Sequence, residues 1–272
     1  MRKLSISAAW EESQAILSHD GRLLTAVALA LVALPSAINS LVNPNGVSAS
    51  ATPWWADLIA VVASLIALAG QLALIRLALG PSITVGGAIA HGMKRLPIYF
   101  VAVLMLVVAL FLAAIPVAFL LSALGVPINQ RPVPMSPALA VVTIAFMALV
   151  IFVGVRLIMS SSVASAEDVG PITILKRSWR LTAGYWWPLF GFLLVFVIGA
   201  IISLMAVGSA VGVVVRLLVG TIQPLSAAAL VLALVQSLVS AAITTLFAVM
   251  LARLYLQLTG RDAQATVPSS GT

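Results

Sequence analysis

Six long apolar stretches fill most of this 272-residue chain, and they limit what it can fold into. They run roughly over residues 23–42, 54–79, 98–124, 138–163, 189–215 and 227–256. Each reaches the length of about 20 residues with which a helix crosses about 30 Å of hydrocarbon. Because 62% of the residues are hydrophobic and only 8% are charged, the polar surface cannot cover a water-soluble globule. The sequence predicts an all-α, polytopic membrane domain of six transmembrane helices over residues 1–262, and a disordered cytoplasmic tail over 263–272.

The positions of the basic residues predict the orientation of this domain. If the first stretch runs outward, only Arg131 and Arg216 lie at the outer face. The other face then holds Arg2, Lys3, Arg22, Arg76, Lys94, Arg95, Arg156, Lys176, Arg177, Arg180, Arg253 and Arg261. Since basic residues concentrate on the cytoplasmic side, both termini are predicted to lie in the cytoplasm. The net charge of +7 does not indicate a nucleic-acid partner, because the basic residues sit at helix ends rather than along one groove.

Few residues in the chain could carry chemistry. There is no cysteine, which excludes disulfides and thiol catalysis. His19 and His91 are the only histidines, and no zinc-binding, dinucleotide-binding or phosphate-binding motif accompanies them. No carboxylate falls near the middle of an apolar stretch, where proton-coupled transporters place one. The sequence therefore predicts no catalytic residues, no metal site and no cofactor.

A threefold internal repeat is predicted from the segments between the stretches. Residues 10–19, 82–96 and 171–183 each form an amphipathic segment followed by two apolar stretches. Arg-Leu pairs recur at equivalent places, as at 22–23, 95–96 and 180–181. Helices of this kind lie in the headgroup layer of a membrane. Each unit is therefore expected to be a short amphipathic cytoplasmic helix and a pair of spanning helices.

Three arginines, one in each predicted repeat, lie inside the cytoplasmic ends of apolar stretches: Arg76, Arg156 and Arg253. One interpretation is that they anchor their helices by extending to the headgroup layer. The other is a basic collar that faces the bundle interior and binds a lipid phosphate or another anion. The sequence alone leaves both open.

The last stretch carries Gln236, Ser240 and Thr244 at intervals of four residues, which places them on one helix face. Hydrogen bonding between helices is the first interpretation of this face, and a lining for a solute pathway is the second. Gly208 and Gly212 in the preceding stretch have the spacing of a helix-contact motif.

Residues 168–187 read DVGPITILKRSWRLTAGYWW. This segment and the six-stretch layout resemble the bacterial family named for the glycerophosphoryl diester phosphodiesterase membrane domain, and the related YciC-like inner-membrane proteins. The resemblance implies a six-helix inner-membrane domain, generally without an assigned activity. A soluble phosphodiesterase domain follows this module in some relatives, but the short segment after Asp262 leaves no room for one. The enzymatic name is therefore not transferred.

The expected function is that of a non-enzymatic protein of the bacterial inner membrane with a scaffold, accessory or lipid-interacting role. Its expected partners are the lipid bilayer, including anionic phospholipids, and other membrane proteins. The alternative is a transporter of a small solute or a lipid, which the internal repeats and the polar face of the last stretch permit.

Overall fold

The computed structural model describes residues 4–42, 54–80, 83–125, 136–219 and 226–260, and every regular element in these ranges is helical. The elements are α1 (Ile6–Ala28), the π-helical turn η1 (Leu29–Ala33), α2 (Leu34–Val42), α3 (Trp54–Leu79), α4 (Val85–Ala123), α5 (Pro137–Arg156), α6 (Ser160–Ala166), α7 (Pro171–Leu181), α8 (Trp186–Val219) and α9 (Ala227–Thr259). Six of the resulting helical segments are long and apolar enough to span a membrane. This confirms the predicted all-α class and the six spans. The predicted tail, residues 263–272, lies outside the described residues.

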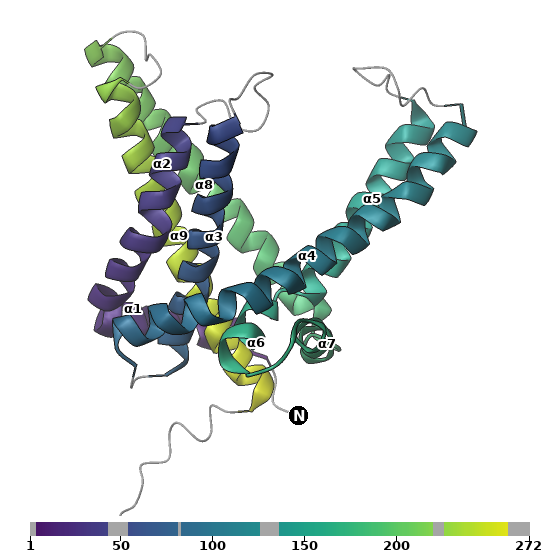
Figure 1. Cartoon of the computed structure of the whole chain (residues 1–272), viewed down its shortest axis with the longest axis horizontal. Coiled ribbons are helices and arrows are strands. Elements are labelled where there is room, and N and C mark those ends of the chain that lie inside the picture. The colour runs from purple at the N-terminus through teal and green to yellow at the C-terminus, as the bar shows by residue number, and fades with distance from the viewer. Residues whose placement is uncertain (1–3, 43–53, 81–82, 126–135, 220–225, 261–272) are drawn as a thin grey trace, which may run out of the picture.

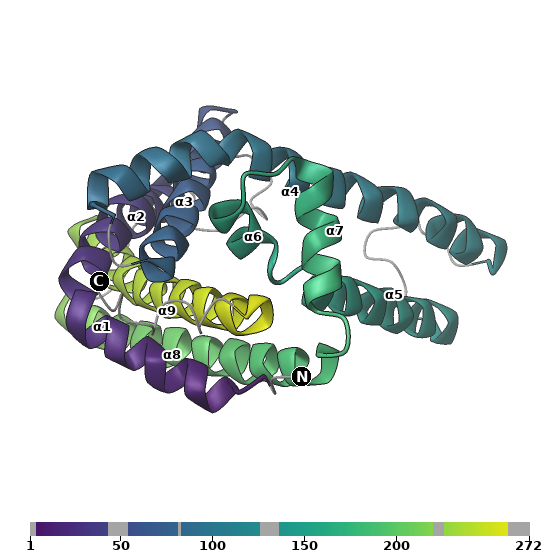
Figure 2. The same ribbon diagram turned by 90° about the horizontal axis from the view of Figure 1, so that it is seen from below.

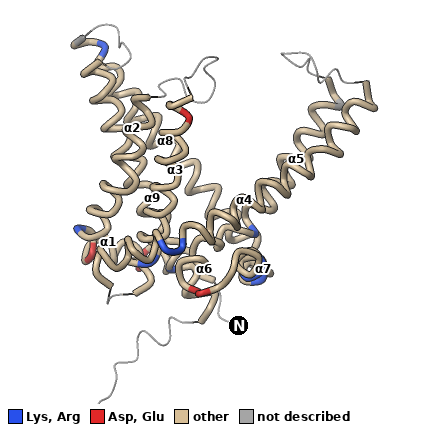
Figure 3. Tube along the Cα trace, viewed as in Figure 1, with Lys and Arg blue, Asp and Glu red and all other residues tan. Residues whose placement is uncertain are grey.

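The spanning helices form two groups (Figure 1). Helices α2, α3, α8 and α9 make one bundle, while α4 and α5 form a hairpin that leans away from it. From below, α7 crosses the space between α4 and α5 (Figure 2). Most Lys, Arg, Asp and Glu residues gather at the end of the molecule that holds α6 and α7 (Figure 3), which we call the charged end. Arg216 lies in the last turn of α8, and this helix ends on the opposite side of the bundle from α6 and α7 (Figure 1).

Short polar residues begin most of the long helices. The hydroxyls of Ser5, Thr84, Ser136 and Ser226 each accept a hydrogen bond from the backbone N–H three residues further on, at 3.1–3.2 Å. Such caps satisfy donors that the first helical turn leaves free. At the opposite terminus, α9 ends on Gly260, whose left-handed φ of 70° suits glycine.

Two of the three predicted amphipathic helices are not separate elements. Residues 10–19 belong to α1, which continues through η1 into α2, and residues 85–96 form the start of the single helix α4. Only the third, predicted over 171–183, is a helix of its own, α7. The turn η1 lies just before Pro35, which has no N–H to donate, so the wider turn lets the helix continue past it. The threefold repeat stays a prediction.

The fourth apolar stretch is broken, although the sequence predicts one helix over 138–163. Helix α5 stops at Arg156, and α6 starts at Ser160 after a turn. The backbone carbonyl of Arg156 accepts hydrogen bonds from Ser178 Oγ of α7 at 3.1 Å and from Oγ1 of Thr182, the C-cap of α7, at 3.0 Å. These bonds replace the helical partner that the carbonyl loses. The break therefore docks α7 against α5.

Glycines let α3 approach its neighbours closely. A Cβ atom at Gly92 of α4 would lie 2.6 Å from the backbone oxygen of Ala69, and one at Gly70 would lie 2.7 Å from the Cβ of Leu31. Small residues serve this purpose in membrane helix packing. The buried residues of α4 lie mostly between Ala88 and Ala102, near the charged end. Beyond this part the hairpin carries large exposed apolar side chains such as Phe119 and Ile144, as expected of surfaces that face lipid.

Candidate functional site

Arg156, one of the three predicted anion-binding arginines, lies beside two aromatic rings. Its guanidinium carbon lies 5.5 Å from the ring centre of Phe152 and 5.3 Å from that of Trp179. Its Nε and Nη1 are buried without a hydrogen-bond partner, whereas Nη2 is not among these buried atoms. Among the described residues, no carboxylate lies within ion-pair distance of it. The rings compensate part of the positive charge by cation–π attraction, but they accept no strong hydrogen bond.

Arg76 lies in the last turn of α3, and its Nε is also buried without a hydrogen-bond partner. The positive charge of Arg76 acts on the ring of His91 on α4. The His91 ring is held by the backbone oxygen of Ser165, at 3.0 Å. Within the described ranges, Arg76 likewise has no carboxylate at ion-pair distance.

Arg253 of α9 has a carboxylate neighbour. Its Nε lies 3.9 Å from Oε2 of Glu12 on α1, which is beyond hydrogen-bond range. The predicted arginines therefore have three different surroundings, namely aromatic rings, a histidine and a distant carboxylate. No contact between described residues joins them into a collar, so the collar stays a prediction.

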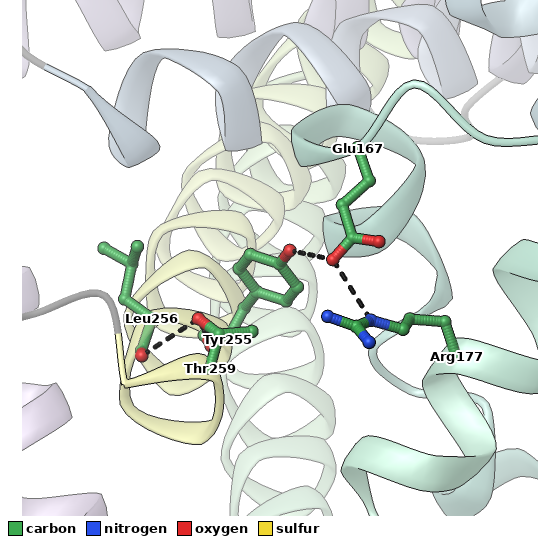
Figure 4. Close-up of polar contacts among 5 residues, drawn as sticks. All are labelled: Glu167, Arg177, Tyr255, Leu256 and Thr259. Carbon is green, nitrogen blue, oxygen red and sulfur yellow. Dashed lines mark hydrogen bonds and ion pairs between the residues drawn. The ribbon is translucent and has the colours of Figure 1, made fainter.

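Two acidic residues in the connection from α6 to α7 form contacts that the sequence analysis did not predict. The Glu167 carboxylate accepts a hydrogen bond from Tyr255 Oη at 2.7 Å and one from Arg177 Nε at 3.3 Å (Figure 4). The next residue, Asp168, pairs with Arg95 of α4, whose side chain is 7% exposed. This polar junction, made of Glu167, Asp168 and their partners, ties α4, α7 and α9 together at the charged end.

The sequence carries a weak signal for the packing of α6, the helix that precedes the junction. Ser160, Ser161, Ser162 and Ser165 place four hydroxyls at the end of an apolar stretch. Hydroxyls that faced lipid there would have no hydrogen-bond partner, which is unfavourable. All but Ser160 are buried, and Ser165 Oγ donates to the backbone oxygen of Leu72 at 2.9 Å. These serines therefore indicated a segment packed inside protein.

The polar face of α9 packs inside the bundle. Gln236 lies against Gly208 of α8, where an added Cβ would be 3.0 Å from Gln236 Oε1, and this oxygen is buried without a hydrogen-bond partner. Ser240 and Thr244 are half-buried on the same helix. The contact of Gln236 with Gly208 is of the kind expected where helices touch.

Six spanning helices, with their charges gathered at one end, define an integral, polytopic membrane protein. The chain belongs to a family described as a domain of unknown function, DUF7847, which matches residues 4–258. No curated protein and no solved structure matches the chain. Since the family description states no activity, the resemblance to the glycerophosphoryl diester phosphodiesterase membrane family stays a prediction.

Proposed function

We propose that this protein is a non-enzymatic membrane module that holds anionic phospholipids at its charged end, mainly through Arg156 and Arg76. The observation that carries the proposal is the Arg156 guanidinium, enclosed by two aromatic rings without a carboxylate partner among the described residues. An enclosed charge without a counter-charge is unfavourable, and a phosphate would supply the missing charge and acceptor oxygens.

The surroundings of Arg156 support a lipid headgroup as the source of that phosphate. Trp179 and Trp186, which both contact the Phe152 ring, are residues typical of the membrane interface. Lys176 is exposed one turn before Trp179 on α7 and adds positive charge on the same surface. Basic groups at this depth attract anionic lipids. The phosphate would reach Arg156 through Nη2, which is not among its buried, unpartnered nitrogens.

Removing the three arginine charges should weaken the retention of anionic lipid. The test variant carries Arg76→Gln, Arg156→Gln and Arg253→Gln together. In native mass spectrometry, we expect it to retain about tenfold less phosphatidylglycerol and cardiolipin than the wild type, or less still. The reason is that each lost charge-assisted hydrogen bond contributes about 1.5–3 kcal/mol. Arg216→Gln, at the far end of α8, is the matched control and should retain both lipids. Unchanged retention by a triple variant with a wild-type melting temperature would reject the proposal. If the triple variant does not fold, Arg156→Gln alone provides the same comparison.

We also propose that the membrane is the bacterial inner membrane and that the charged end faces the cytoplasm, as the positions of the basic residues favour. Because the chain has no cysteine, single cysteines report this orientation directly. Exposed alanines lie at each end: Ala123 ends α4 far from the charged end, and Ala183 follows α7. A membrane-impermeant maleimide added to spheroplasts should label Ala123→Cys but not Ala183→Cys, and opened vesicles should label both. The reverse pattern would refute the orientation.

The alternative function is transport of a small solute or a lipid. It would use the polar face of α9 as a pathway, but the contact of Gln236 with Gly208 favours helix packing. Scaffolding of other membrane proteins is compatible with the lipid-holding role, since bound lipid and partner proteins can occupy different faces.

A further inference from the structure

An apolar groove lies between α1, α8 and α9, and none of the three arginines lines it. Its volume is about 830 Å³, which is within the range of pockets that bind small molecules. The groove follows one face of α8 from Gly191 to Ser203 and is bordered on α9 by Ile243, Leu246 and Met250. The first turns of α1 border it at the charged end.

Small residues on α8 create the space in this groove. A Cβ atom at Gly191 or Gly199 would meet nothing within 4 Å. Ala200 and Ser203 continue the same lining. From Gly191 to Ser203 the helix rises by about 18 Å, slightly more than the about 15 Å of one hydrocarbon leaflet. The groove is therefore as long as a lipid chain in a single leaflet.

The mouth of the groove differs chemically from its interior. Ser7, Trp10 and Glu11 of α1 line it at the charged end. Glu11 is exposed, and none of the ion pairs between described residues includes it. A carboxylate beside an indole ring is a favourable setting for an ammonium group, which forms an ion pair with the first and a cation–π contact with the second.

We propose that the groove binds one phospholipid, with an acyl chain along α8 and a zwitterionic, amine-bearing headgroup at Glu11 and Trp10. The polar mouth at one end and the apolar lining beyond it match an amphiphile one leaflet long. A partner helix would instead continue through both leaflets. The negative charge of Glu11 disfavours an anionic headgroup, so this site selects a different lipid class from the one proposed for the arginines. Either proposal can therefore fail without the other.

A larger side chain in the groove tests the position of the acyl chain. The full-length protein is placed in nanodiscs of equal phosphatidylethanolamine and phosphatidylglycerol, released, and analysed by native mass spectrometry. Gly199→Leu should lower the retained phosphatidylethanolamine at least about tenfold, since displacing two methylene groups from an apolar site is enough for that change. Gly212→Leu, on the same helix, also has open space around it but does not line the groove, so it should retain the lipid as the wild type does.

Removing the charge at the mouth tests the headgroup. Glu11→Gln should abolish the preference of the groove for phosphatidylethanolamine, so that less phosphatidylethanolamine and more phosphatidylglycerol is retained while the number of bound lipids stays the same. Asp57→Asn, in the first turn of α3 and outside the groove, should keep the preference. Wild-type retention in Gly199→Leu would overturn the proposal, as would wild-type preference in Glu11→Gln. The proposal would also be overturned if Gly199→Leu caused the loss of a bound second copy of the protein and not of a lipid. If Gly199→Leu does not fold, Gly191→Leu serves the same purpose.

Discussion

Alanine in place of Gly92 is expected to destabilise the protein by about 3 kcal/mol, the upper end of the usual cost of overpacking a core. The added Cβ would lie 2.6 Å from the backbone oxygen of Ala69 and 3.3 Å from the Cβ of Ala73. The close atom is backbone in the middle of α3, so it cannot move aside as the end of a flexible side chain would. Helices α3 and α4 must therefore separate, and the hairpin loses its closest contact with the bundle.

Unfolding in mixed detergent micelles, followed by circular dichroism, would measure this loss. Gly86→Ala in the first turn of α4 is the control, because a Cβ there meets nothing within 4 Å. Its stability should stay the same or rise by up to about 1 kcal/mol, since alanine favours a helix over glycine. Equal stabilities of the two variants would show that α3 and α4 do not touch at Gly92.

Loss of the Glu167 carboxylate is expected to have the next largest effect, about 2 kcal/mol for Glu167→Ala. The side chain is 13% exposed and accepts a hydrogen bond from the hydroxyl of Tyr255, a residue that is fully buried. Hydrogen bonds to charged groups contribute about 1.5–3 kcal/mol. Its other partner, Arg177, is 44% exposed, so that ion pair adds little. Faster hydrogen exchange in α6 and α7 should accompany the loss, because Glu167 connects them to α9.

Glu12→Ala provides the matched comparison for this result. It also removes a glutamate that faces an arginine, but at 3.9 Å and with a side chain that is 45% exposed. Exposed ion pairs contribute about 0–1 kcal/mol, so its melting temperature should change little. In a double-mutant cycle, Tyr255→Phe should cost much less in the Glu167→Ala background than in the wild type. Additive effects would contradict the direct bond between the two residues.

The spanning helices could be predicted from the sequence because apolar length is a local property. The stretch predicted over 54–79 is helix α3, and the others differ from the observed helices mainly at their ends. The break after Arg156 could not be predicted in this way. The serines at 160–162 mark a polar end of the apolar stretch, but they do not indicate where the helix breaks. The bonds that stabilise the break come from Ser178 and Thr182, more than 20 residues after Arg156.

The candidate site was predictable in its residues but not in its contacts. The sequence places Arg156 at a helix end, and Phe152 follows from it as the residue one turn earlier. Trp179 comes from a different helix, so only the fold brings it to the guanidinium. The same holds for Arg95 with Asp168 and for Glu167 with Tyr255, which are far apart in the chain. The groove depends on α1 lying beside α8, which no local pattern indicates.

The leaning α4–α5 hairpin has a mechanical consequence. From Pro97 to Ala123, α4 would be about 40 Å long at a rise of about 1.5 Å per residue, against about 30 Å of hydrocarbon. A helix that exceeds the hydrocarbon thickness has to recline within it. Because the buried residues of α4 lie mostly near the charged end, we expect the hairpin to tilt about that end. In a thicker membrane the hairpin would tilt less from the bilayer normal, and in a thinner one it would tilt more. Its tilt angle would therefore depend on the thickness of the surrounding bilayer.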